Sequence, residues 1–334
     1  MTGYAVVGLL VMIVSETATI ARIEPFWSWN TPIAWTGFIL FADGIVFRRR
    51  GSSWITSAPG EFGFLAIASI PLWLVFEFFN RFIDNWYYVN LPENTLLRYF
   101  GYAWSFATIW PAMFEGAELI AVWRGALAAV RAKAGLKTRA TTATPITRAT
   151  TADSNTGAAP AVSNTGATTA DRNTRATTVV AQDFSPAHLT RGQWMSIAVG
   201  AAMLVWPLIW PSRYLAAPVW LGFIFLLDPI NERLGGDSLS ADLRRREYDR
   251  LANLALSGLL CGVLWEFWNY WSHAKWHYTV PIMENLKIFE MPFPGYFGFP
   301  AFAFECFTMY VFVRIMWVRL GGTTPRQLGR TIAL

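Results

Sequence analysis

Two carboxylate–amide pairs stand in apolar stretches of the chain and could carry out acid–base chemistry. Glu77 precedes Asn80 by three residues, and Glu266 precedes Asn269 by the same distance. Residues three apart lie on one face of a helix, so each amide can orient the carboxyl group beside it. A carboxylic acid that an apolar site keeps neutral can donate a proton to a bound substrate. We therefore expect Glu266 to be the principal acid, oriented by Asn269, with Glu77 in the matching place.

A second pair of glutamates, Glu115 and Glu305, comes shortly after Pro111 and Pro300 in apolar segments. A proline inside a helix removes a hydrogen bond and kinks the helix, which makes room for a polar pocket. A charged side chain inside a membrane costs about 2.5–3.5 kcal/mol. All four glutamates are therefore candidate catalytic residues, with Glu305 expected beside Glu266. The alternative is that they only join helices, by hydrogen bonds worth roughly 0.6 kcal/mol each.

Aromatic side chains follow both carboxylate–amide pairs, and tryptophans crowd the second pair most closely. The faces of Trp, Tyr and Phe rings stabilise a carbocation by cation–π attraction and do not attack it. The two Trp-x-Tyr pairs are equally compatible with an aromatic belt at the level of the lipid headgroups. The candidate substrate-binding residues are Asn80, Trp86, Tyr88, Trp265, Trp268, Trp276 and Tyr278.

The composition of the chain is that of an integral membrane protein. Of its 334 residues, 54% are hydrophobic and 15% are charged, whereas roughly a quarter are charged in soluble proteins. The mean hydropathy is +0.32. These values exclude a soluble enzyme, and two cysteines exclude a disulfide framework. The net charge of +5 is spread over segment ends and indicates no nucleic-acid partner.

Several sequence blocks recur in the same order. WTGFILFADGI from Trp35 returns as WLGFIFLLDPI from Trp220, and FEFFN from Phe76 returns as WEFWN from Trp265. Matches in one order indicate an internal duplication. The predicted fold is an all-α integral membrane protein with about eight transmembrane helices, arranged as two tandem four-helix repeats. The expected helices cover residues 3–20, 32–47, 62–79, 99–123, 194–210, 216–228, 251–271 and 295–317.

A segment of different composition separates the two repeats. Residues 124–183 contain no Phe, Trp or Tyr, and near-copies of TRATTA recur in them. Such a segment cannot bury enough apolar area to offset the entropy of ordering it. We expect a first membrane repeat at 1–123, a flexible low-complexity cytoplasmic linker at 124–190, a second membrane repeat at 191–320 and a cytoplasmic tail at 321–334.

Lysine and arginine residues predict the orientation in the membrane, because they accumulate on the cytoplasmic side. The linker, Arg48–Arg50 and Arg244–Arg246 fall on one side of the predicted helices. We expect a multi-pass protein of the cell membrane with cytoplasmic N- and C-termini and parallel halves. The carboxylate–amide pairs then lie at the outer side. Asp43 and Asp228 lie near the inner side, each close to an arginine, and a structural ion pair is expected for both.

Two histidines and two cysteines are expected to have no catalytic or metal-binding role. His273 and His277 are four apart, which would place them on one helical face at a spacing that can bind a metal. No further histidine or cysteine completes a site, so we expect no metal and solvated histidines. Cys261 and Cys306 stand alone in apolar helices and are expected to pack as small hydrophobic side chains. No cofactor is expected.

Both halves repeat one order of features: a carboxylate in a helix, a Trp-x-Tyr pair, and a helix with proline before glutamate. This order resembles the membrane lycopene-cyclase domain and the related carotenoid hydratases. The residues that carry the resemblance are Glu77, Trp86, Tyr88, Pro111 and Glu115, then Glu266, Trp276, Tyr278, Pro300 and Glu305. It covers about residues 31–123 and 216–318. The resemblance implies an intramembrane acid-catalysed cyclase, hydratase or isomerase of a polyisoprenoid or carotenoid-like lipid, which needs no redox cofactor.

Two other classes of function stay open at this point. Tandem parallel halves with carboxylates at the membrane midplane are typical of secondary transporters, here of a small molecule or a lipid. A structural subunit of a membrane complex would use the glutamates only to join helices. Membrane lipids are expected partners in every case, whereas the oligomeric state is not predicted.

Overall fold

The structure is a computed structural model that describes residues 1–141 and 189–323, with side chains for 1–129 and 189–323. The chain divides into two compact units, one formed by Met1–Ala128 with Thr190–Leu334 and the other by Ala129–Leu189. Of the second unit, the structure describes the C-terminal part of helix α5 and Leu189. All other described helices and strands belong to the first unit.

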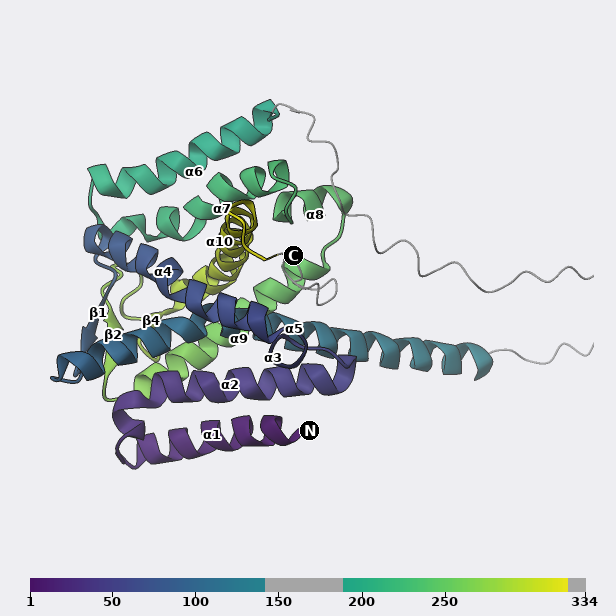
Figure 1. Cartoon of the computed structure of the whole chain (residues 1–334), viewed down its shortest axis with the longest axis horizontal. Helices are drawn as coiled ribbons and strands as arrows, with labels where there is room; N and C mark the ends of the chain where they lie inside the picture. Colours follow the sequence, from purple (N-terminus) through teal and green to yellow (C-terminus); the bar gives the residue numbers. More distant parts are fainter. Residues whose placement is uncertain (142–188, 324–334) are drawn as a thin grey trace, which may run out of the picture. The chain divides into compact units, whose positions relative to one another are not determined.

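Helices make up most of the described residues (Figure 1). The α-helices are α1 (Gly3–Ile20), α2 (Phe26–Arg50), α3 (Trp54–Ser57), α4 (Pro59–Ile83), α5 (Thr95–Thr141), α6 (Arg191–Ile209), α7 (Ala216–Arg233), α8 (Leu239–Arg245), α9 (Asp249–Trp271) and α10 (Gly298–Arg319). Short 3-10 helices precede two of them, η1 (Arg213–Leu215) before α7 and η2 (Phe293–Phe297) before α10. Two antiparallel strand pairs complete the fold, β1 (Trp86–Val89) with β2 (Lys275–Tyr278) and β3 (Lys287–Ile288) with β4 (Met291–Pro292).

Seven described helical segments are long and apolar enough to cross a membrane. They are α1, α2, α4, α6, η1 with α7, α9, and η2 with α10. The chain is therefore a polytopic membrane protein with an all-α membrane part, as its composition predicted. Helix α5 continues past its predicted end at Trp123 to Thr141, because Ala, Leu, Lys and Arg follow and all favour helix. The rest of the predicted linker, residues 142–188, and the tail from 324 onward lie outside the described residues.

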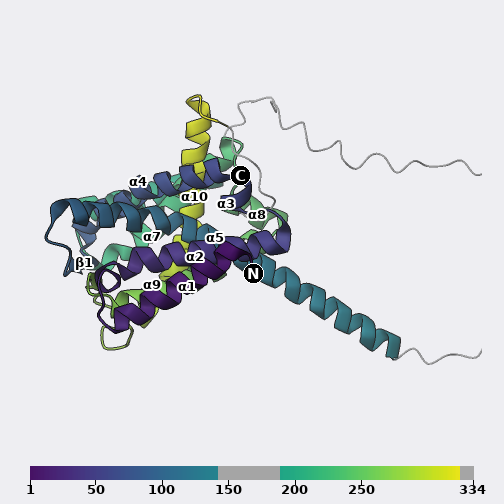
Figure 2. The same cartoon turned by 60° about the horizontal axis from the view of Figure 1, so that its bottom comes forward.

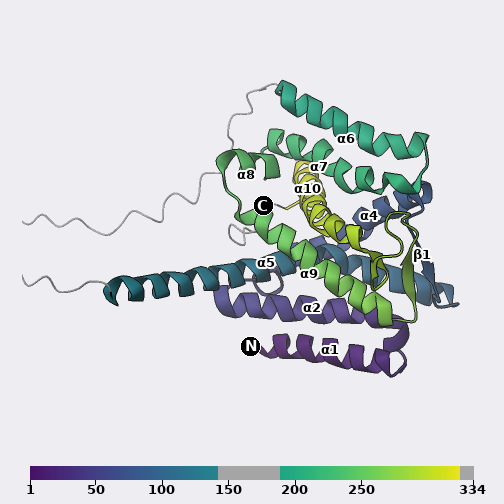
Figure 3. The same ribbon diagram turned by 180° about the vertical axis from the view of Figure 1, so that it is seen from behind.

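Glycines bring helices together in two pairs (Figures 2 and 3). α1 lies against α2, and a Cβ atom added to Gly8 would stand 2.5 Å from the Gly37 carbonyl oxygen. α6 lies against α7, and a Cβ atom added to Gly200 would stand 2.7 Å from the Gly222 carbonyl oxygen. Small residues let helix backbones approach closely within a membrane. Each half of the chain thus begins with the same kind of helix pair.

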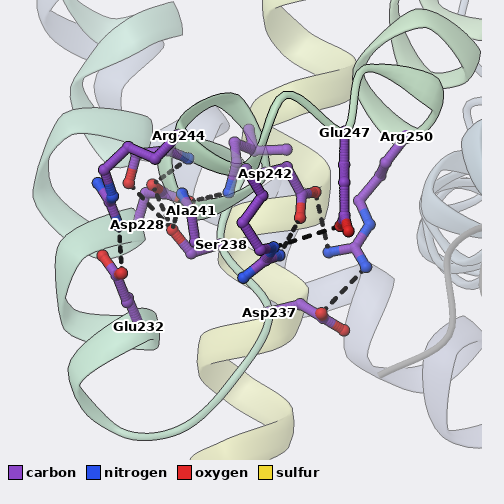
Figure 4. A network of polar contacts seen from close by, with 12 residues as sticks. Asp228, Glu232, Asp237, Ser238, Ala241, Asp242, Arg244, Glu247 and Arg250 are labelled. Atoms are coloured by element: carbon purple, nitrogen blue, oxygen red, sulfur yellow. Dashed lines mark hydrogen bonds and ion pairs between the residues drawn. The ribbon is translucent and has the colours of Figure 1, made fainter.

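An aspartate holds the chain segment that leaves each pair. Asp43 accepts hydrogen bonds from the Ser53 hydroxyl, at 2.9 Å, and from the backbone N–H two residues further on. Asp228 accepts from the Ser238 hydroxyl, also at 2.9 Å, and from the backbone N–H two residues further on (Figure 4). The arginine partners predicted for both aspartates are wrong, because hydroxyl and N–H groups of the following segment occupy the carboxylates instead.

Ion pairs connect the segment around α8 to the start of α9 (Figure 4). Arg250 lies 3.0 Å from Asp237 and 3.4 Å from Asp242. Arg245 also pairs with Asp242, at 2.5 Å. Burial raises the pKa of Asp242 above its usual value in spite of both arginines. These contacts fix the short α8 between two membrane-spanning helices.

Contacts between the halves occur deep in the helix core. The Trp110 indole of α5 donates a hydrogen bond to the Cys306 carbonyl oxygen of α10, at 2.9 Å. Arg314 of α10 donates two hydrogen bonds of 2.6 Å to the carboxylate of Glu61 in α4. Both side chains of this ion pair are buried. Buried contacts therefore join the two halves.

Candidate functional site

A cavity of about 530 Å³ lies between elements of the two halves. Its volume falls within the range of about 300–1,000 Å³ that is usual for small-molecule sites. Residues of α2, α4, β1 and α5 line it from the first half, and residues of η1, α7, α9, β2 and α10 from the second. Its walls contain seven tryptophans: Trp29, Trp35, Trp73, Trp86, Trp220, Trp265 and Trp276. The space is therefore mainly aromatic.

The two Trp-x-Tyr pairs form an antiparallel ribbon at the cavity wall. Trp86 lies opposite Tyr278, and Tyr88 lies opposite Trp276, across strands β1 and β2. Alternate residues of a strand share one face, and all four of these side chains line the cavity. Tyr87, between them, is 49% exposed. The spacing of two that defines the motif is thus the period of a strand, and no strand was predicted there.

The two histidines do not share a helical face, because α9 ends at Trp271 and His277 lies in β2. The His277 Nδ1 atom lies 2.9 Å from Oε2 of Glu290. The His273 ring stacks on Trp27 with 4.1 Å between the ring centroids. Among the described residues, no group of three His, Cys, Asp or Glu side chains could hold a metal ion.

Tyr278 connects the cavity to Glu266. Its hydroxyl donates a hydrogen bond of 2.7 Å to Oε1 of Glu266 and accepts one of 2.8 Å from the Trp276 indole. Glu266 is buried, and its Oε2 atom has no hydrogen-bond partner among the described residues. Burial and the neighbouring Glu266 carboxyl group raise the pKa of Tyr278 well above its usual value. The phenol therefore stays protonated, one hydrogen bond away from a buried carboxyl group.

Tyr88 connects the cavity to Glu77 in a similar way, at 2.5 Å between the hydroxyl and Oε1. Two more donors reach the same oxygen atom, the indole N–H groups of Trp73 at 2.9 Å and Trp86 at 3.3 Å. Burial and the Glu77 carboxylate raise the pKa of Tyr88 well above its usual value. The first half thus repeats the tyrosine–carboxyl pair but surrounds it with donors.

The asparagines hold the strands and do not contact the glutamates. The Asn80 amide donates to the Trp86 carbonyl oxygen at 2.8 Å, and the Asn269 amide donates to the Trp276 carbonyl oxygen at 2.9 Å. Each asparagine side-chain oxygen also accepts from the backbone N–H of the same tryptophan. The group that contacts the Glu266 carboxyl is Tyr278, so the orienting role expected of Asn269 falls to the tyrosine.

Glu115 and Glu305 are buried away from the cavity lining. Glu305 accepts a hydrogen bond of 3.2 Å from the backbone N–H of Phe223, and neither carboxyl oxygen of Glu115 has a partner among the described residues. No hydrogen bond or ion pair within the described part of the chain joins Glu305 to Glu266. Pro300 lies in the first turn of α10, where a missing N–H breaks no helical hydrogen bond. The kink predicted at Pro300 is therefore wrong.

The cavity gathers most of the residues predicted to bind a substrate. The predicted residues that line it are Trp86, Tyr88, Trp265, Trp276 and Tyr278. Trp268 is buried behind this wall and packs edge-on against Trp35, with 4.8 Å between ring centroids. The sequence analysis missed Trp35, Trp73 and Trp220, because helix patterns do not show which helix faces meet. All three carried a signal, since Trp73 stands one helical turn before Glu77 and Trp35 and Trp220 begin the first repeated sequence block.

Two tyrosine–carboxyl pairs, related by an antiparallel strand pair, thus stand at the wall of an aromatic cavity in a polytopic membrane protein. No protein-family model matches the chain, and neither a curated protein nor a solved structure matches it.

Proposed function

We propose that the chain is built from two tandem repeats of four transmembrane helices, with α5 as an eighth crossing. Contacts that recur in the same order along both halves support this arrangement. The glycine-paired helices, the aspartate-held segments and the asparagine-held strands each occur once per half. Residues matched by sequence have equivalent neighbours in the two halves. Gly37 and Gly222 each meet a glycine of the preceding helix, and Asp43 and Asp228 each bind a serine ten residues further on.

In this arrangement both termini are cytoplasmic and the β1–β2 ribbon lies on the outer side of the cell membrane. Cysteine labelling tests the orientation, and the native Cys261 and Cys306 are buried, so background labelling should be low. A cysteine at Asn90, next to β1 and exposed, should react in intact cells. A cysteine at Ser154 should react only after permeabilisation. Reaction of Ser154→Cys in intact cells would overturn the orientation.

We propose that the protein binds an unsaturated, isoprenoid-like lipid in the aromatic cavity and acts on it as an acid-catalysed cyclase, hydratase or isomerase. The single observation that carries this proposal is the Tyr278–Glu266 pair on the wall of a cavity with seven tryptophans. The resemblance to lycopene cyclases and carotenoid hydratases points in the same direction. Such chemistry needs a neutral acid and aromatic faces that stabilise a carbocation, which the buried Glu266 carboxyl group and the tryptophans of the cavity would supply.

The proton would pass from Glu266 to the cavity through Tyr278. When Glu266 is protonated, its O–H donates to the Tyr278 oxygen and the phenol O–H turns toward the lipid. As the phenol then gives its proton to a carbon–carbon double bond of the lipid, the carboxyl group gives its own proton to the phenol oxygen. The lipid becomes a carbocation and Glu266 becomes a carboxylate. Loss of a proton from the cation, directly in an isomerase or after ring closure in a cyclase, returns the proton to the pair. In a hydratase, water adds to the cation and supplies the returning proton.

Mass spectrometry of co-purifying lipids tests the proposal. Gly101 lines the cavity, and the space beside it is open, so Gly101→Trp should fill the cavity. Gly125→Trp is the matched control, because Gly125 lies in the same helix, is exposed and does not line the cavity. We expect an isoprenoid lipid to co-purify with the wild type and the control and to be lost from Gly101→Trp.

Three other outcomes would contradict the proposal. Equal recovery of the lipid from Gly101→Trp would remove the cavity as its site. Recovery of ordinary phospholipids alone would favour a structural role. A specific lipid that is bound but never converted would favour a carrier over an enzyme.

A further inference from the structure

The cavity carries positive charge without any negative charge in its lining. Arg98, Arg213 and Lys275 line it, and no aspartate or glutamate does. The three cations come from the start of α5, from η1 and from β2. The aromatic residues of α4 and α9, such as Trp73 and Trp265, lie further along the membrane-spanning helices. The cavity is therefore amphipathic, with a cationic end beside the β1–β2 ribbon and an aromatic interior.

Of the three cations, Arg98 is the one without a carboxylate partner. Arg213 pairs with Asp84, and Lys275 lies 3.0 Å from Glu290. Arg98 donates only from Nε, to the Pro92 carbonyl oxygen at 2.9 Å. Its two terminal guanidinium nitrogens make no hydrogen bond or ion pair with a described residue, and these are the atoms that bind phosphate in a bidentate manner.

A free hydroxyl also lines the cavity. Thr31, at the start of α2, lines the cavity, and its Oγ1 atom is buried without a hydrogen-bond partner among the described residues. The starts of α2 and α5 are in contact, because Trp29 packs against Phe100 with 5.5 Å between ring centroids. The helix starts that carry Thr31 and Arg98 are thus packed together beside the cavity that both residues line.

We propose that the ligand of this cavity is an isoprenoid lipid with a phosphate or diphosphate head group, which Arg98 binds, assisted by Thr31. The proposal rests on the proposed function and narrows it from isoprenoid lipids in general to their phosphate esters. The head group lies beside the β1–β2 ribbon, the unsaturated tail extends among the tryptophans of α4 and α9, and the tyrosines of the ribbon lie nearest the head-group end of the tail. The head group anchors the lipid and takes no part in the proton transfer.

Calorimetric titration of the full-length protein in a non-ionic detergent tests this inference with four probes. They are farnesyl diphosphate, farnesol, inorganic diphosphate and phosphatidic acid. A charged hydrogen-bonding group is worth about 1.5–3 kcal/mol, so the wild type should bind farnesyl diphosphate about tenfold or more tighter than farnesol. Arg98→Gln should remove this preference and leave farnesol binding unchanged, which also shows that the variant is folded. Arg98→Lys should keep part of the preference.

Arg81→Gln is the matched control, because Arg81 is exposed at the end of α4 and does not line the cavity. It should keep the full preference for farnesyl diphosphate. Equal binding of farnesol and farnesyl diphosphate by the wild type, or an undiminished preference in Arg98→Gln, would overturn this inference alone. Tight binding of inorganic diphosphate would indicate a site for free phosphate, and displacement by phosphatidic acid would indicate a phospholipid site. If neither isoprenoid binds, the proposed function fails as well.

Discussion

The two tyrosine–carboxyl pairs share one framework and differ in the hydrogen bonds that surround the carboxyl group. In each half an asparagine three residues after the glutamate holds the strand that carries the tyrosine. In the second half, Glu266 accepts one hydrogen bond, from Tyr278. In the first half, three donors converge on Oε1 of the glutamate. They belong to Tyr88, Trp73 and Trp86, and the acceptor is Glu77.

One sequence position accounts for much of this difference. Trp73 stands one helical turn before Glu77, whereas Gly262 stands one turn before Glu266. The ring of Phe299 packs against Gly262 so closely that an added Cβ atom would stand 2.3 Å from it. No indole can therefore reach Glu266 from that position. Donors bind an ionised acceptor most strongly, so we interpret the first-half carboxylate as an anchor and Glu266, with one free oxygen, as the acid.

We expect the largest difference in unfolding free energy between substitutions of the two arginines in the last helix of each half, Arg314 and Arg124. Arg314 is bound to Glu61 with side-chain exposures of 4% and 6%, whereas Arg124 is bound to Asp249 with exposures of 32% and 92%. Breaking a buried ion pair costs about 3–5 kcal/mol, and an exposed pair is worth about 0–1 kcal/mol. Arg314→Gln should therefore destabilise the protein severely and Arg124→Gln barely. Unfolding in mixed micelles measures both, and equal effects would contradict the burial of the first pair.

Removing each tyrosine hydroxyl should destabilise the two sites by different amounts. Tyr278→Phe removes the one hydrogen-bond donor that Glu266 has among the described residues, and an unsatisfied buried polar group costs about 1–3 kcal/mol. Tyr88→Phe leaves two indole donors on Glu77 and should cost about 0.5–1.5 kcal/mol, the net value of one hydrogen bond. Parallel unfolding curves of the two variants compare these costs. A larger loss in Tyr88→Phe would reverse the assignment of anchor and acid.

Acidification should loosen the strand region at residues 275–292, together with the β1 strand that pairs with β2. Burial raises the pKa of Glu290, but hydrogen bonds from His277 and Lys275 outweigh it, so the pKa lies below the ordinary value of 4.5. A carboxyl group with a lowered pKa in the folded state contributes stability above its ordinary pKa, which is lost as the pH falls through the lowered value.

Hydrogen exchange measures this effect. After correction for the intrinsic pH dependence, residues 275–292 and the paired strand β1 should lose protection below about pH 4.5, and helix α6 (Arg191–Ile209) serves as the internal control. Glu290→Gln should make the protection independent of pH in this range. A wild-type strand region that stays equally protected in acid would show that Glu290 does not hold it.

The sequence predicted the membrane character, the helix positions and the aromatic–carboxylate association, because these depend on composition and on local spacing. It did not predict the β1–β2 ribbon, although the period of two in Trp86–Tyr88 is that of a strand. It also did not predict that Glu305 lies apart from Glu266. That separation depends on how α9 and α10 pack, which local spacing does not encode. The cationic end of the cavity, with Arg98, likewise arises only when distant helices come together.

Turnover of the co-purifying lipid by Glu266→Gln and Glu77→Gln tests the central claim most directly. Both changes keep the shape of the side chain and remove the acid. A positioned general acid contributes about 10²–10⁴-fold to the rate. Glu266→Gln should therefore lose conversion by that factor while it still binds the lipid, and Glu77→Gln should stay within about tenfold of the wild type, since an anchor need not transfer a proton. Full activity of Glu266→Gln, or equal losses in both variants, would contradict the assignment of Glu266 as the acid.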